Sequence, residues 1–131
     1  MIEPLIITFL QSDTAISEYC GNAMYIMSAP ANTQYPHIIV TADNSLDPSG
    51  IISIFDIKIN IHDHSLDKEP LLNISQRIKD LLHHKTINET GNYHRMRLWF
   101  EERTHVRDPE THSPYLSIRF TGRAIEIPPG L

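Results

Sequence analysis

The most regular pattern in the chain covers residues 55–62, where apolar and polar residues alternate one by one. The apolar positions are Phe55, Ile57, Ile59 and Ile61, and the polar positions between them are Asp56, Lys58, Asn60 and His62. Because successive side chains of a strand point to opposite faces, the pattern predicts a strand with one buried and one solvated face. A slip of one residue would expose four large apolar groups, so we expect this strand to be the centre of the sheet, in a firmly set register.

Two helices are predicted at the start of the chain. Apolar residues at helical spacing over 2–11 predict the first, which tolerates Pro4 in its first turn. Either Ser12 or Asp13 is suited to cap a second, shorter helix, and Gly21 fits the position just past its end.

Two strands are predicted between these helices and the central strand, at 23–28 and 37–42. Residues typical of turns fill the segments that follow them, 29–36 and 43–50. The second of these loops should return the chain antiparallel into the central strand.

A longer helix is predicted after the central strand, opening at 65–68 and running to about His84. Asp67 is a suitable cap, and Glu69 favours the positive end of the helix dipole. Its apolar stripe consists of Leu71, Ile74, Ile78, Leu81 and Leu82. The other side is polar, so we expect an amphipathic helix followed by a turn-prone connection at 86–92.

The last part of the chain predicts two paired strands, at 93–103 and 115–127. The polar face of the first carries Arg95, Arg97, Trp99, Glu101 and Arg103, and that of the second carries Ser117, Arg119, Thr121 and Arg123. The linking loop, 104–114, is polar apart from Val106 and long for a hairpin, which is typical of functional or mobile loops.

The predicted order is therefore helix, helix, three strands, helix and two strands. This order is typical of an α+β domain with a single, mainly antiparallel sheet of about five strands and helices on one face. No repeat, linker or low-complexity tract divides the chain, so we expect one domain over 1–131.

The composition is consistent with a single α+β domain, and it narrows the kinds of site and the location to be expected. A chain of 131 residues with 40% hydrophobic and 21% charged residues can bury a core of ordinary size. The single cysteine, Cys20, excludes an internal disulfide and a cysteine-rich metal site. Neither a basic secretory leader nor an apolar run near the roughly 20 residues of a membrane span is present, so we expect a protein of the cell interior.

Charge is distributed unevenly along the chain. The net charge is −5, and all eleven lysines and arginines lie between Lys58 and Arg123, whereas 1–57 contains six acidic residues. Two interpretations remain: compositional drift, or one acidic and one basic surface suited to head-to-tail packing of identical subunits. The negative balance argues mildly against a general nucleic-acid-binding protein.

Catalytic and metal chemistry find little support in the sequence. His62 and His64 share one strand face and His83 and His84 end the long helix, but neither pair has a third zinc ligand at a recognisable spacing. Nothing around Cys20 favours an activated thiolate, and the five glycines are too scattered for a phosphate-binding loop. We therefore expect no enzyme activity, catalytic residue, cofactor or metal site.

The polar face of the last two strands is the strongest candidate site. Arginine and tryptophan dominate protein interfaces, although exposed aromatic and guanidinium groups also suit nucleic acids, and a plain solvated face is a further alternative. Interleaved glutamates at Glu101, Glu102 and Glu126 would repel phosphates, which favours a protein interface. The predicted interface residues are Arg95, Arg97, Trp99, Arg103, Val106, Arg107, Asp108, Arg119 and Arg123.

Three local features carry a resemblance to a known family. They are Asp-Thr-Ala-Ile at 13–16, Tyr-Pro-His-Ile-Ile-Val at 35–40, and Leu-Leu-Asn-Ile-Ser-Gln-Arg-Ile-Lys-Asp-Leu-Leu at 71–82 after a long strand. In these features, in size and in element order, nearly the whole chain resembles the tail-completion or tail-terminator proteins of long-tailed bacteriophages and prophages, which have relatives in gene transfer agents.

The resemblance implies a homo-oligomeric ring, a hexamer, that caps the finished tail tube, stops its polymerisation and joins it to the head. The implied partners are further copies of the chain, the tail tube protein and the head-side connector or neck protein, with DNA passing through the ring and no membrane. The implied locations are the host bacterial cytoplasm during assembly and then the virion tail. Two alternatives stay open: another head–tail joining or neck component, and a small nucleic-acid-binding module that uses the Arg/Trp face.

Overall fold

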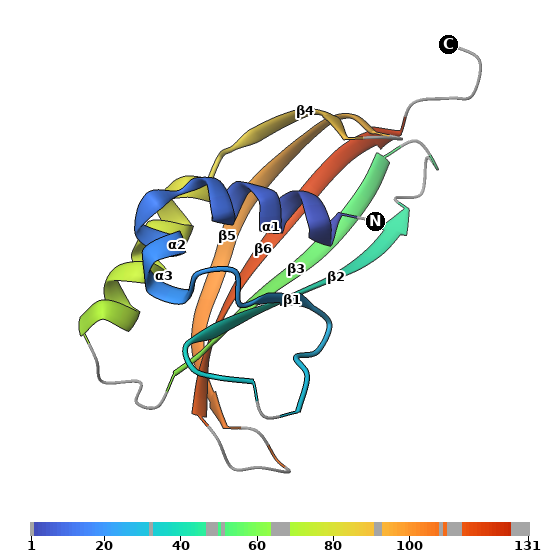
Figure 1. The fold of residues 1–131 in the computed structure, drawn as a ribbon. Coiled ribbons are helices and arrows are strands. Elements are labelled where there is room, and N and C mark those ends of the chain that lie inside the picture. Colours follow the sequence, from blue (N-terminus) through green and yellow to red (C-terminus); the bar gives the residue numbers. More distant parts are fainter. Residues whose placement is uncertain are drawn as a thin grey trace.

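The structure is a computed structural model that describes residues 2–31, 33–46, 50, 52–63, 69–90, 93–107, 109 and 114–126, with the backbone alone at 87–90, 93–95, 125 and 126. These residues form one sheet of six strands with three helices against one face (Figure 1). The elements are α1 (Glu3–Ser12), α2 (Thr14–Cys20), β1 (Met24–Ile26), β2 (His37–Leu46), β3 (Ile52–His62), α3 (Glu69–Leu82), β4 (Thr86–Thr90), β5 (Tyr93–Arg107) and β6 (Pro114–Glu126).

Strand β3 lies inside the sheet, whose strand order is β1-β2-β3-β6-β5-β4. It pairs antiparallel with β2 on one side and with β6 on the other, and β5 pairs antiparallel with both β6 and β4. The short outer strand β1 runs parallel to β2. The prediction of an α+β fold with a mainly antiparallel sheet around the strand at 55–62 is confirmed.

The alternation within β3 decides which face of the sheet is buried. The core-facing side chains of the two middle strands are Phe55, Ile57, Ile59, Ile61, Leu116, Ile118 and Phe120, all at most 3% exposed. The apolar stripe of α3 covers them, with Leu71, Ile74, Ile78 and Leu82 buried as predicted. Helices α1 and α2 add Ile6, Leu10 and Ile16 to the same layer. Burial of these groups is the main stabilising contribution to the fold.

Asp13 fixes the junction between α1, α2 and α3. Its carboxylate accepts a hydrogen bond from the backbone N–H of Ile16, which makes Asp13 the N-cap of α2. Of the two predicted caps, Ser12 and Asp13, it is therefore Asp13 that caps the helix. A second oxygen accepts the Nε–H of Arg77 on α3 at 2.8 Å. Burial by itself raises the pKa of Asp13, but these bonds and the positive charge of Arg77 outweigh it and lower the pKa below the usual 3.8.

We expect Asp13→Ala to lower the free energy of unfolding by about 1–2 kcal/mol at neutral pH, since it removes a cap and the partner of Arg77. Because the folded-state pKa is depressed, the contribution of the charge is present above pH 3.8 and is lost as the pH falls through the folded pKa. The difference between wild type and variant should therefore shrink in acid. Urea titrations from pH 7 down to pH 3 measure this; a difference that stays constant with pH would contradict it, and Asp13→Asn, which keeps the cap, is the control.

Three segments differ from the prediction at their boundaries. Residues 86–90 form β4, where a connection at 86–92 was expected, because they pair with the outer edge of β5. Strand β2 continues to Leu46, into the expected loop 43–50. The expected loop 104–114 is also shorter, because β5 runs to Arg107 and β6 begins at Pro114. The predicted cap at Asp67 lies outside the described residues.

A β-bulge in β5 changes which face its side chains occupy. Phe100 is opposite Phe120 and Glu102 is opposite Arg119, so Glu101 is an extra residue between them. Before the bulge the odd-numbered residues point away from the helices, and after it the even-numbered residues do. The prediction that Arg103 shares a face with Arg97 is therefore wrong: Arg103 lies on the helix side, where its Nη1 donates to Ser75 Oγ of α3 at 3.0 Å.

Candidate functional site

The face of the sheet opposite the helices, called the open face from here on, presents the polar half of each strand's alternation. Among the described residues no helix covers it (Figure 1). Cross-strand pairing sets its side chains in rows from β2 through β3 and β6 to β5. One row is Thr41, Lys58, Arg119 and Glu102; the next is Asp43, Asp56, Thr121 and Trp99. The open face is therefore built from two strand pairs, β2 with β3 and β5 with β6, that are distant from each other in sequence.

Arg119 is the electrostatic centre of this face. Its Nε donates to Asp56 Oδ1 at 2.8 Å, and its Nη1 donates to Glu102 Oε1 at 3.4 Å. The bond and the negative charge of Asp56 raise the pKa of Arg119 above its usual value, with a further contribution from Glu102. The guanidinium is thus held in a fixed orientation between two carboxylates, which satisfies most of its charge locally.

A second cationic group lies towards the β4 side of the open face. Arg97 is opposite Arg123 in the ladder, and its guanidinium lies 5.6 Å from the ring centre of Trp99, a cation–π distance. Its Nη2 is 3.5 Å from His84 Nδ1, a contact at the limit of hydrogen bonding. Both arginines are exposed and, in the described part of the chain, neither has a carboxylate partner. Their positive charge is therefore exposed on the open face.

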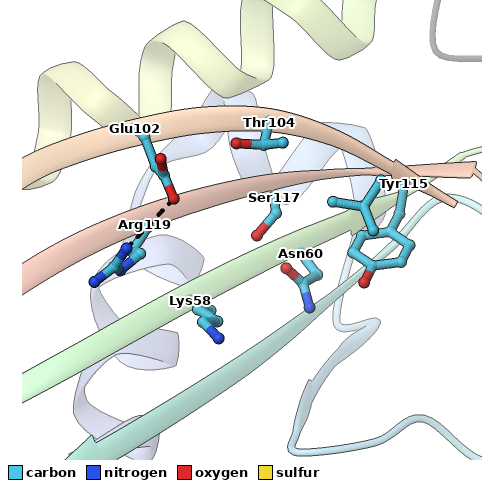
Figure 2. A pocket seen from close by; sticks show the side chains of 8 residues that line it. Lys58, Asn60, Glu102, Thr104, Tyr115, Ser117 and Arg119 are labelled. Atoms are coloured by element: carbon cyan, nitrogen blue, oxygen red, sulfur yellow. Dashed lines mark hydrogen bonds and ion pairs between the residues drawn. The ribbon is translucent and has the colours of Figure 1, made fainter. Parts of the chain in front are cut away.

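A hollow of about 230 Å³ lies beside Arg119 on the open face. It is lined by Lys58, Asn60, Glu102, Thr104, Val106, Tyr115, Ser117 and Arg119. Figure 2 shows these side chains rising from β3, β6 and β5 around it. Asn60 Oδ1 is buried there and makes no hydrogen bond with any described residue. The hollow has the mixed polar and apolar character of a contact point for a partner side chain, with one acceptor left to be satisfied.

Stacked rings form a row at the end of the open face next to this hollow. His37 stacks on His62 with 4.7 Å between ring centres, and His62 stacks on Tyr115 at 4.8 Å. The ring of Tyr25 meets that of His37 edge-on, and the ring of Tyr35 is tilted against it. Burial lowers the pKa of His37, and the hydrogen bond to the Gln34 carbonyl opposes this shift only in part. The row makes this end of the face rigid and partly apolar.

The structure brings together four of the predicted interface residues: Arg97, Trp99, Arg119 and Arg123. Val106 also lies on the open face, at the hollow. Arg103 and, by the same alternation, Arg107 lie on the helix side of β5. The Arg95 side chain and Asp108 fall outside the described residues.

Lys58 and Tyr115 are surface residues that the prediction did not select. The alternation at 55–62 already assigned Lys58 to the polar side, but only the sheet order sets it beside Arg119. Tyr115 could be expected to face outwards from the parity of β6, yet its ring stacking depends on β3. Glu102 reaches Arg119 through the bulge, which no local pattern indicates.

The remaining titratable groups in the described part of the chain offer little chemistry. Among the described residues no three His, Cys, Asp or Glu side chains converge in a way that could hold a metal ion. Cys20 is half-buried, and burial raises its pKa to about 11, which disfavours the reactive thiolate. None of the described helices is long and apolar enough to cross a membrane.

Comparison with known proteins finds a structural neighbour. No family model and no curated protein matches the sequence. Among solved structures, the chain is similar to one from the virion of a native gene transfer agent particle, with a TM-score of 0.72, 15% sequence identity, and coverage of 92% of this chain and 91% of that chain. The two chains share a fold over almost their entire lengths.

Proposed function

We propose that this protein is a non-enzymatic, structural component of a phage-like particle, and specifically the tail terminator. In this role a ring of identical subunits, six by the resemblance, caps the finished tail tube, stops its polymerisation and joins it to the head-side connector. The protein assembles in the host bacterial cytoplasm and remains in the virion tail, with DNA passing through the ring. The likeness of fold to a gene transfer agent virion chain, covering more than nine-tenths of both chains, is the observation that carries this proposal.

The open face supports a role in contacts rather than in chemistry. Some of its charges are held in fixed pairs, as at Arg119, and others are exposed with no carboxylate partner among the described side chains, as at Arg97 and Arg123. Fixed pairs give geometric specificity, and exposed arginines beside an aromatic ring are common at the centre of protein interfaces. Neighbouring copies of the chain, the tail tube and the connector are the partners proposed for this face.

A tube-polymerisation assay tests the proposal. The tail tube protein of the same particle is assembled in vitro with and without the purified protein, and tube lengths and ends are measured by electron microscopy. The expected result is that tubes stop growing and carry a ring of extra density at one end. Unchanged tube lengths with bare ends would contradict the terminator role, and binding to connector protein alone would favour another neck component.

Nucleic-acid binding by the Arg/Trp face is the alternative from a different class. The structure weakens its basis, since Arg119 is already paired with two carboxylates and Arg103 lies on the opposite side of the sheet. Arg97, Trp99 and Arg123 remain together as a smaller cationic group. Tight binding to a single-stranded oligonucleotide that falls steeply with salt would favour this alternative.

Charge reversal at Arg97 tests the open face as an interface. We expect Arg97→Glu to weaken self-association or tube binding roughly 5- to 10-fold at low salt and less at 0.5 M salt, because the lost attraction is between exposed charges and is screened. Light scattering over a dilution series at both salt concentrations measures it. Lys79→Glu on α3, remote from the open face, is the matched control; equal behaviour of the two variants would count against the assignment.

A further inference from the structure

Two stretches of the sheet edge lack a neighbouring strand. Strand β1 pairs only with Ile38–Val40 of β2, and β4 pairs with the first residues of β5, up to Arg97. Within the described part of the chain, no backbone hydrogen bond is made on the outer side of 42–46 of β2 or of 103–106 of β5. Edges of this length are normally shortened, bulged or covered, because they can pair with another chain.

The outward backbone groups of β2 can be assigned from the bonds made further along the strand. Ile38 N–H donates to the Ala23 carbonyl, and the Val40 carbonyl accepts the Met27 N–H, so the even-numbered residues point towards the edge. The register with β3 is unbroken to Leu46. The N–H and C=O groups of Ala42, Asn44 and Leu46 therefore point outwards.

The same reasoning applies to β5, with the bulge taken into account. Leu98 exchanges backbone bonds with Lys85 and His84 on its outer side, and Phe100 N–H donates outwards to His83 Nδ1 at 2.9 Å. The extra residue at Glu101 then moves the outward positions from even to odd numbers. The backbone groups of Arg103 and His105 thus point to the edge, and both residues are exposed.

The two edges are compatible in direction and in face. From β2 through β3 and β6 to β5 each neighbouring pair is antiparallel, so β2 and β5 run in opposite directions. A second copy with the same face outwards would bring its β5 beside β2 as an antiparallel pair. Figure 1 shows the uncovered end of β2 and the far end of β5 at opposite corners of the sheet. Pairing them offsets each copy along the strands, which is the stagger that a closed ring of tilted strands requires.

The side chains along the β2 edge do little to prevent pairing. Leu46 is 57% exposed and Met27, where β1 leaves β2, is 73% exposed. An uncovered β2 edge with two exposed large apolar side chains and no lysine or proline is poorly guarded against pairing.

We propose that residues 42–46 of one copy form an antiparallel β-ladder with residues 103–107 of the next copy. The contact is head-to-tail, so each subunit uses both edges and the sheet continues from copy to copy. The expectation that identical subunits associate rests on the proposed ring. The pairing of these two edges is a separate claim.

Proline substitutions at outward positions test the pairing. Asn44→Pro and His105→Pro each remove an N–H that bonds to no described residue of the subunit, so each should leave the fold intact and abolish pairing at one edge. Asn44→Thr and His105→Thr keep the N–H and are the controls. Native mass spectrometry is expected to find each proline variant as a 15.0 kDa monomer and each threonine variant assembled.

A mixture of the two proline variants gives the sharpest result. Asn44→Pro keeps its β5 edge and His105→Pro keeps its β2 edge, so a 1:1 mixture should form a heterodimer that grows no further. Formation of this dimer also demonstrates that both variants are folded. Independently, hydrogen exchange in the wild type should show amides in 42–46 and 103–107 protected at high concentration and unprotected on dilution.

Each other outcome has a defined meaning. Proline variants that keep the wild-type mass would overturn the edge pairing and leave the ring proposal standing. Dimers of His105→Pro alone would mean that two β2 edges pair, which overturns the head-to-tail arrangement. A wild type that is monomeric, with both segments unprotected, would overturn the pairing and the ring together. Edge-paired assemblies that fail to stop tube growth would instead refute the terminator function alone.

Discussion

Replacing Phe120 by alanine is expected to lower the free energy of unfolding by about 3–5 kcal/mol. Phe120 is fully buried in the middle of β6, and its ring meets that of Phe100 edge-on with 5.9 Å between centres. Truncation removes the burial of an aromatic ring and leaves a cavity that the neighbouring strands cannot close. Because natural domains are stable by about 5–15 kcal/mol, the variant would lose a large share of its stability.

Urea unfolding followed by circular dichroism measures this loss as a lower midpoint at an unchanged slope. The adjacent Thr121→Ala is the matched control, since Thr121 points to the open face and should cost less than about 1 kcal/mol. A loss at Phe120 no larger than that at Thr121 would mean that the sides of β6 have been assigned the wrong way round.

Enlarging Gly122 is expected to have the second-largest effect. Gly122 lies on the core side of β6, opposite Leu98, and a Cβ atom there would be 2.9 Å from Leu98 Cδ2 and 3.2 Å from Met96 Sδ. Alanine needs only small shifts of these flexible side-chain ends. Valine adds two further methyl groups to a filled core, so we expect a cost of about 1–3 kcal/mol for Gly122→Val and a smaller one for Gly122→Ala.

Thermal unfolding of the two variants beside wild type tests this order. The higher strand propensity of valine acts in the opposite direction, which makes a clear loss of stability diagnostic of crowding at this position. Ser117→Val, at an outward position of the same strand, controls for propensity alone. A Gly122→Val protein as stable as wild type would show that Met96 and Leu98 can move aside at little cost.

Local patterns predicted the parts of the fold that depend on near neighbours. The structure confirms the alternation at 55–62, the apolar stripe of 71–82 and the cap at Asp13. The first two follow from the repeat of a strand or a helix, and the third is a hydrogen bond between residues three apart in the sequence. Strand β4 was missed because its residues favour turns, and their pairing with β5 is a tertiary contact. The candidate surface was predicted in outline for the same reason: its residues alternate along two strands, and four of them do meet.

What the sequence by itself determined is the period of each element, and hence which side chains are apolar and which are polar along it. The tertiary structure alone decided where Arg103 points, which carboxylates hold Arg119, and which strand edges no described residue covers. The bulge at Glu101 shows the physical reason. One extra residue reverses the facing of everything after it, and only the pairing with β6 shows where that residue lies.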